Sequence, residues 1–173
     1  MSAATRQPIR LKDYKVPPYF ILKTKLRFEL GEESTEVQSN LSLQRNPLAK
    51  EEDRLLRLHG ESIELLELKL NGAALSEDDY QKDEEFLTIP NFPEEGELII
   101  RTRIRPQDNT TLEGLYKSNE LFCTQCEAEG FRHITYFLDR PDVLSRYTTT
   151  IVGDQQTYPT LLSNGNPIDS RSL

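Results

Sequence analysis

The sequence predicts a mostly β fold, a twisted antiparallel sheet or sandwich with little helix. Apolar and polar residues alternate with a period of two in most of the apolar segments, which is the pattern of half-buried strands. Glycine and proline end these segments, and few stretches show the 3.6-residue period of a helix. A chain of 173 residues has the usual size of one domain with one core, so we expect a single β-rich domain over residues 1–173.

Two alternating runs open the chain. The first run, residues 20–30, predicts a strand. Its apolar face comprises Phe20, Leu22, Leu26, Phe28 and Leu30. Ile21 falls on the opposite, charged face. After a polar turn at residues 31–34, the second run places Val37, Leu41 and Leu43 on one face. Because the turn is short, the two runs predict an antiparallel hairpin.

Two short strands follow a polar loop at residues 46–53. They are expected at residues 55–58 and 63–70, and each ends at a glycine turn. In the second strand the apolar phase slips between Leu65 and Leu66, which favours a β-bulge over a helical turn.

An acidic loop at residues 77–85 precedes the next pair of strands. It lacks the glycine placement of a calcium-binding loop, so we interpret it as a solvated loop. Residues 86–89 and 97–105 are the strands, and proline ends both of them. The inward face of the longer strand is expected to carry Leu98, Ile100, Thr102 and Ile104.

The last third of the chain predicts two further strand pairs. Residues 112–117 are expected to pair with residues 120–125 around a Ser118-Asn119 turn, and residues 145–153 with residues 157–163. Only residues 129–138 indicate a short helix. The chain contains no internal repeat.

Composition excludes several classes of function. The formal net charge of −8 at pH 7 repels phosphate backbones and anionic lipids, so we expect neither nucleic acid nor membrane as a partner. No apolar run approaches the ~20 residues that cross a bilayer. Residues 1–15 contain four basic residues and no apolar core of a signal peptide, which favours a cytoplasmic protein.

The cysteines and histidines form no recognisable metal or nucleophile motif. Cys123 and Cys126 have the spacing of redox pairs and zinc half-sites, but residues three apart on an extended strand point to opposite faces. The two histidines, His59 and His133, lie far apart in the sequence. We therefore expect no metal site and no catalytic residue in this chain, and interpret these four residues as structural.

Acidic residues offer two weaker candidates. Glu127 and Glu129 are two apart and would face the same side of an extended segment, as a glycosidase pair does, but acidic pairs on solvated faces are far commoner. The run Asp139-Arg140-Pro141-Asp142 indicates a turn with an internal ion pair.

One long segment resembles a known family of enzymes. The run NTTLEGLYKSNELFCTQCEAEGFRHITYFLDRPDVLSRYTTTIVGD, from Asn109, and then YPTLLSNGN closely resemble the N-terminal domain of bacterial aminopeptidase N, an alanyl aminopeptidase of the gluzincin family of zinc peptidases. Earlier residues are similar in pattern, including Asp13-Tyr14 and Pro17-Pro18-Tyr19. The resemblance spans nearly the whole chain and is strongest over residues 111–166.

The resemblance implies a saddle-like β domain that covers the active site of a zinc aminopeptidase. In such enzymes a Gln-x-Glu element binds the free α-amino group of the substrate, and this element aligns with Gln125 and Glu127, within the segment 109–166. The implied partners are a peptide N-terminus and the enzyme's own catalytic domain.

The family's catalytic motifs have no match in the chain. HExxH with its downstream glutamate is absent, and the GxMEN loop is excluded because the only methionine is Met1. The zinc ligands of the parent enzyme would therefore lie outside this chain, which we predict to be inactive alone. The alternative is a free-standing β module that binds a peptide or a protein partner without chemistry.

Overall fold

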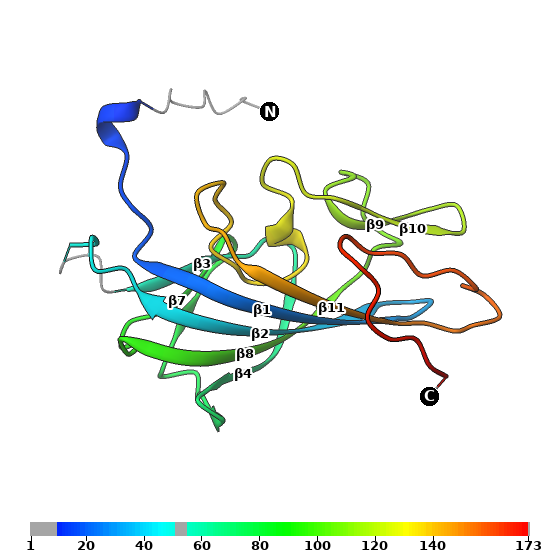
Figure 1. The fold of residues 1–173 in the computed structure, drawn as a ribbon, viewed down its shortest axis with the longest axis horizontal. Coiled ribbons are helices and arrows are strands. Elements are labelled where there is room, and N and C mark those ends of the chain that lie inside the picture. Colours follow the sequence, from blue (N-terminus) through cyan, green and yellow to red (C-terminus); the bar gives the residue numbers. More distant parts are fainter. Residues whose placement is uncertain (1–9, 51–54, 173) are drawn as a thin grey trace.

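The computed structural model, which describes residues 10–50 and 55–172, confirms the mostly β fold. Its largest element is a six-stranded sheet in the order β11-β1-β2-β8-β4-β5 (Figure 1). The strands of this sheet are β1 (Tyr19–Leu30), β2 (Thr35–Arg45), β4 (Glu64–Leu70), β5 (Ala73–Ala74), β8 (Glu95–Ile104) and β11 (Arg146–Val152).

Two smaller sheets and two single-turn 3-10 helices complete the described fold. A three-stranded sheet in the order β3-β7-β6 comprises β3 (Leu56–His59), β7 (Phe86–Ile89) and β6 (Gln81–Lys82). A two-stranded sheet pairs β9 (Gly114–Ser118) with β10 (Leu121–Gln125). The helices are η1 (Leu11–Asp13) and η3 (Phe131–His133). In the described residues, no helix has the length and apolar character that a membrane span requires.

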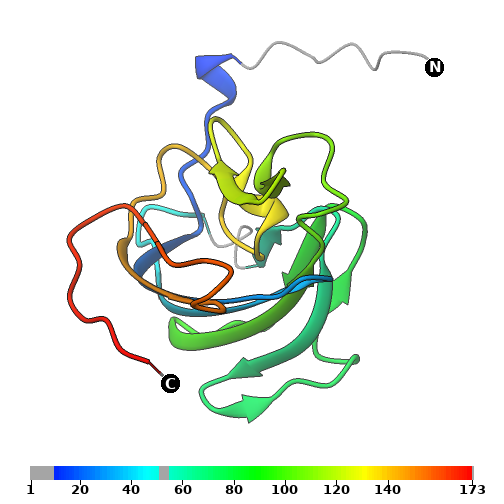
Figure 2. The same ribbon diagram turned by 90° about the vertical axis from the view of Figure 1, so that its right-hand side faces the viewer.

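The large sheet curves around one side of the core, and the segment that contains η3 lies inside the curve (Figure 2). One cluster of buried side chains joins this sheet to β3 and β7 and includes Ile21, Leu58, Leu87, Leu98 and Ile100. A second cluster lies near β9 and comprises Leu26, Phe28, Val37, Ile104, Leu115 and Ile134. Both clusters contain residues from the segment 131–138, which therefore holds the layers together.

Most of the expected strands form. β1 and β2 make the predicted hairpin, and Leu98, Ile100, Thr102 and Ile104 of β8 are all buried. The register of β4 shifts between Leu65 and Glu67, which confirms the predicted bulge. β9 and β10 also pair as expected. The loop predicted at residues 46–53 is described only to residue 50, so its remainder lies outside the described residues.

The expected inward face of β1 is wrong at its start. Ile21 is fully buried, whereas Phe20 and Leu22 are 39% and 49% exposed. A register irregularity between Ile21 and Lys23 adds one residue to the strand at this point. Because one extra residue inverts the alternation, Tyr19 and Ile21 share the core face with Leu26 and Phe28.

The last predicted hairpin is also wrong. β11 pairs in parallel with β1, from Lys23 opposite Arg146 to Glu29 opposite Val152. Residues 157–163 contain no strand. A parallel neighbour requires a long connection rather than a tight turn, so no local sequence pattern marks this pairing. A short hydrogen bond of 2.7 Å between the hydroxyls of Thr24 and Ser145 supports it at the start of β11.

The helix expected at residues 129–138 is wrong except for the single turn η3. Every residue from Ile134 to Leu138 is buried, and Phe137 forms a β-bridge with His59. A helix of this length would have exposed one side. The chain instead leaves the helical path after η3, and all five residues from Ile134 to Leu138 are buried.

Gly60 provides a test of this packing. A Cβ atom at Gly60 would lie 2.3 Å from the buried ring of Tyr136, so we expect Gly60→Ala to lower the free energy of unfolding by about 2 kcal/mol through overpacking. Gly153→Ala is the control, because its Cβ would meet neighbours no closer than 3.7 Å. Urea unfolding of both variants measures the difference, and equal stabilities would contradict the packing described.

Candidate functional site

Gln125 and Glu127 lie together at the end of β10. Both residues are exposed, and the side-chain amide of Gln125 donates a hydrogen bond of 3.2 Å to the backbone carbonyl of Glu127. The peptide bond between Glu127 and Ala128 is cis. No described side chain forms an ion pair with the Glu127 carboxylate. The structure thus presents a free carboxylate beside an amide on one short turn.

Two glycines hold this turn against the base of β9. Gly130 donates its backbone N–H to the carbonyl of Cys126 at 3.0 Å, which closes the turn that contains Glu127. A Cβ atom at Gly130 would lie 2.4 Å from the Gln125 carbonyl oxygen, and one at Gly114 would lie 2.7 Å from the Cβ of His133. Gly114 also has a φ of +73°, which favours glycine. The two glycines lie against each other, since a Cβ atom at Gly130 would be 3.0 Å from the Gly114 nitrogen and one at Gly114 would be 3.0 Å from the Gly130 carbonyl oxygen. Only glycine at both positions permits this approach, which we call the glycine contact.

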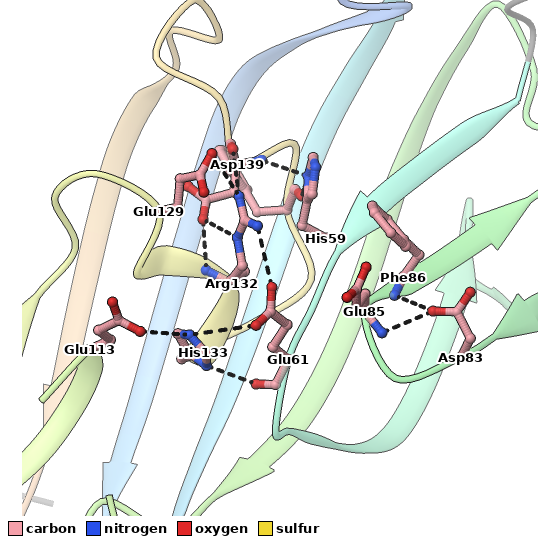
Figure 3. A network of polar contacts seen from close by, with 11 residues as sticks. His59, Glu61, Asp83, Glu85, Phe86, Glu113, Glu129, Arg132, His133 and Asp139 are labelled. Carbon is pink, nitrogen blue, oxygen red and sulfur yellow. Dashed lines mark hydrogen bonds and ion pairs between the residues drawn. The ribbon is translucent and has the colours of Figure 1, made fainter. Parts of the chain in front are cut away.

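Arg132 is the centre of a polar network beneath the turn (Figure 3). Its Nε donates to Asp139 Oδ2 at 3.0 Å, and its Nη2 donates to the Asp139 carbonyl at 3.2 Å. Nη1 donates to Glu61 Oε1 at 3.3 Å, and Nη2 forms an ion pair with Glu129 Oε1 at 3.6 Å. The Arg132 side chain is only 13% exposed. Burial alone would lower the pKa of Arg132, but the carboxylates of Asp139 and Glu61 raise it, so the charge is retained.

The network ties the turn to distant parts of the chain. Glu129 belongs to the same turn as Glu127, Glu61 follows β3, and Asp139 follows the buried segment 134–138. The backbone N–H of Glu61 also donates to the Arg132 carbonyl at 3.0 Å. Movement of the turn would therefore break contacts to two other segments, and this restrains it.

The two histidines contact residues of this network. Nε2 of His133 lies 3.5 Å from Glu113 Oε2, and its Nδ1 lies 3.2 Å from the Glu61 carbonyl. Nδ1 of His59 accepts the backbone N–H of Asp139 at 3.3 Å. Among residues 10–50 and 55–172, no group of three or more His, Cys, Asp or Glu side chains could hold a metal ion.

The cysteines on either side of Gln125 are both free thiols and partly buried. Burial, and to a lesser extent the charge of Asp139, raises the pKa of Cys126 to about 11. At neutral pH this group is a thiol, which is a poor nucleophile and metal ligand.

The other acidic candidates have local structural partners. Glu129 is engaged by Arg132, so it does not pair with Glu127. The carboxylate of Asp142 accepts two hydrogen bonds from Arg140, at 2.9 and 2.7 Å, and these lower its pKa. In the acidic loop, Asp83 Oδ1 accepts the backbone N–H groups of Glu85 and Phe86, as a turn-forming aspartate does.

Sequence reasoning missed Arg132, Gly114 and Gly130. The only signal in the sequence was that a glycine follows each of Glu113 and Glu129. Nothing in the sequence indicated that Gly114 and Gly130 are in contact in the fold. The residues Gln125 and Glu127, expected from resemblance, are brought together.

Removal of the Arg132 charge should destabilise the fold. We expect Arg132→Met to lower the free energy of unfolding by about 3 kcal/mol, because the largely buried Asp139 carboxylate would lose its partner. Arg27→Met is the matched control, since the Arg27–Glu29 pair is 42% and 55% exposed and contributes little. Urea unfolding distinguishes them, and an equal loss for both variants would contradict the structural role of Arg132.

His59 should make the fold sensitive to mild acid. Burial, followed by the charge of Arg132, lowers the pKa of His59 below 6.5. The folded state then binds fewer protons than the unfolded state, so the contribution is complete above pH 6.5 and is lost as pH falls through the lowered pKa. We expect unfolding free energies measured between about pH 7 and pH 5 to fall less steeply for His59→Asn than for the wild type. Parallel curves would contradict this.

Comparison with known proteins gives consistent matches. Residues 16–173 match the family model of the peptidase M1 N-terminal domain. The chain is 46% identical to aminopeptidase N of Escherichia coli (strain K12) over 161 residues, which are 93% of this chain and 18% of that protein. It is 45% identical to aminopeptidase N of Caulobacter vibrioides over 173 residues, which are 100% of this chain and 20% of that protein. The chain thus spans about a fifth of the length of these relatives.

Solved structures agree with these matches. The crystal structure of Legionella pneumophila aminopeptidase A in complex with aspartic acid superposes with a TM-score of 0.87 and 34% identity, over 95% of this chain and 19% of that chain. Native leukotriene A4 hydrolase from Saccharomyces cerevisiae shares the fold, with a TM-score of 0.65 and 21% identity over 84% of this chain and 26% of that chain. The resemblance read from the sequence is confirmed, and the chain belongs to the peptidase M1 N-terminal domain family.

Proposed function

We propose that this domain binds the free α-amino group of a peptide in a zinc aminopeptidase that releases N-terminal amino acids, and that it covers the active site of that enzyme. The observation that carries the proposal is the Glu127 carboxylate. It is exposed and has no ion-pair partner among the described residues, whereas Glu129 and Asp139 contact Arg132 and Glu113 contacts His133. The aminopeptidase relatives support the reaction class.

Charge recognition explains why an exopeptidase would use such a group. A carboxylate ~4 Å from an ammonium gains about 4 kcal/mol of Coulomb energy at an effective dielectric constant of ~20, before desolvation is subtracted. An internal peptide nitrogen carries no charge and would leave Glu127 unpaired. Gln125 adds a neutral hydrogen-bonding group beside it, which helps to orient the ammonium.

A fixed amino-group site also sets where the substrate is cut. If Glu127 holds the ammonium at one point, the first peptide carbonyl lies at a constant distance from it, and only that bond reaches the catalytic groups. A constant distance requires that Glu127 is held rigidly. The glycine contact and the Arg132 network supply this rigidity, because both restrain the turn that contains Glu127.

The catalytic chemistry belongs elsewhere in the enzyme. One structural neighbour is an M1 zinc metallopeptidase from Deinococcus radiodurans, and a bound zinc ion would polarise the scissile carbonyl and activate a water. The described residues of this chain do not fit such a site, because they contain no suitable cluster of ligands. Their role is to bind and orient the substrate.

The part of the chain that follows the buried segment offers apolar contacts for a catalytic domain. Large apolar side chains are strongly exposed after the buried segment, including Leu144 at 85%, Leu162 at 84% and Ile168 at 87%. Exposed apolar groups of this kind mark interaction sites. We propose that the catalytic domain of the same enzyme covers them.

Substitution of Glu127 tests the proposal in an active enzyme that contains this domain. We expect Glu127→Ala to lower kcat/KM for aminoacyl p-nitroanilides about 30- to 100-fold, because a desolvated charge pair contributes about 2–3 kcal/mol to transition-state binding. Gln125→Ala should lower it about fivefold, since a neutral hydrogen bond contributes less.

Glu120→Ala is the matched control for this experiment. Glu120 is an exposed carboxylate in the turn of the same β9–β10 hairpin, so its loss changes the net charge equally without touching the proposed site. Its kinetics should match the wild type. Unchanged kinetics for Glu127→Ala, or an equal loss for both glutamate variants, would falsify the assignment.

A further inference from the structure

The β9–β10 hairpin carries the proposed amino-group site at one end and needs support at the other. A two-stranded sheet is only marginally stable by itself. Its base, where Gly114 lies opposite Gln125, is held by the glycine contact. Three residues before Gln125 in β10, Phe122 lies opposite Lys117, about 10 Å from the site.

Four side chains from three separate segments meet at this second point. The ring of Tyr158 packs against that of Phe122, with centroids 5.2 Å apart, and the ammonium of Lys117 lies 5.4 and 5.7 Å from the two ring centroids. Lys117 donates to Glu32 Oε2 at 3.1 Å, and the Tyr158 hydroxyl donates to Glu32 Oε1 at 2.8 Å. We name Glu32, Lys117, Phe122 and Tyr158 the hairpin clamp.

The two segments that contact the hairpin in this clamp, around Tyr158 and around Glu32, are each held by hydrogen bonds of their own. Tyr158 follows a turn in which Asp154 Oδ1 accepts the backbone N–H and the hydroxyl of Thr157, each at 2.8 Å, and the Asp154 carbonyl accepts the N–H of Tyr158 at 2.8 Å. The Glu32 carbonyl accepts a bond of 2.6 Å from the side-chain amide of Gln107. Figure 1 shows the segment after β11, in orange, turning back beneath β9 and β10.

We infer that the hairpin clamp positions Gln125 and Glu127, with Tyr158 as the positioning residue. This inference rests on the proposed function. Without the clamp, a tilt of the hairpin by about 10° would displace Gln125, about 10 Å from Phe122, by about 2 Å, and misplacement of a substrate-binding group by about 1 Å can lower activity about 100-fold. The clamp removes this tilt by joining β10 to the β1–β2 turn and to the segment after β11.

The test uses kinetics of a full-length enzyme that contains this domain, with L-alanyl p-nitroanilide as the substrate. We expect Tyr158→Ala to lower kcat/KM about tenfold and Tyr158→Phe about threefold, because phenylalanine keeps the ring contact and loses only the bond to Glu32. Glu32→Gln retains the side-chain shape without its charge and should resemble Tyr158→Phe. Tyr14→Phe is the matched control, since its hydroxyl donates to Asp142 at 2.9 Å far from the hairpin, and it should behave as the wild type.

A double-mutant cycle separates positioning from general stability. If Tyr158 acts through Glu127, Tyr158→Ala should change kcat/KM less than about twofold in a Glu127→Ala background. A full tenfold loss in that background, or no loss in the wild-type background, overturns the inference while the proposed function stands. If Glu127→Ala alone has no effect, the proposed function fails and the inference fails with it. Should Tyr158→Ala not fold, the same cycle with Tyr158→Phe gives the answer.

Discussion

The buried guanidinium of Arg132 constrains the architecture around the candidate site. A charge that is 13% exposed must be matched by polar partners, and Arg132 donates hydrogen bonds to Asp139 and Glu61 and forms an ion pair with Glu129. Glu129 and Asp139 lie on either side of Arg132 in the chain, whereas Glu61 is 71 residues away, so satisfying one cation restrains the turn beside β10 and the buried segment 134–138 against the residues that follow β3. The glycine contact at Gly114 and Gly130 then brings the end of β10 onto this base.

In the proposed function, the domain divides its charged groups between support and recognition. Carboxylates near Arg132 and His133 form internal contacts, whereas Glu127, in the same turn as Glu129, remains exposed. Such a division suits a site that must recognise a charge without moving, because the supporting carboxylates restrain the turn while the Glu127 carboxylate stays available. The second support, at Tyr158, lies at the opposite end of the hairpin.

Local patterns predicted the strands well and the long-range contacts poorly. Alternation was sufficient for β2, β8 and the bulge in β4, because each depends on which face meets the core. It failed at Phe20 and Leu22, where an added residue inverts the phase, and at β11, whose parallel partner is more than a hundred residues away. Gln125 and Glu127 were predicted as site residues only through family resemblance, and Arg132 was not predicted because its partners become neighbours only in the fold.

A structure of the full-length enzyme with a bound N-terminal amino acid would test the role of Glu127 most directly. We expect a Glu127 carboxylate oxygen to lie within about 3 Å of the α-ammonium, with Gln125 beside it and the Arg132 contacts to Asp139 and Glu129 intact. A ligand whose ammonium is held by other carboxylates, with Glu127 turned away into solvent, would contradict that role.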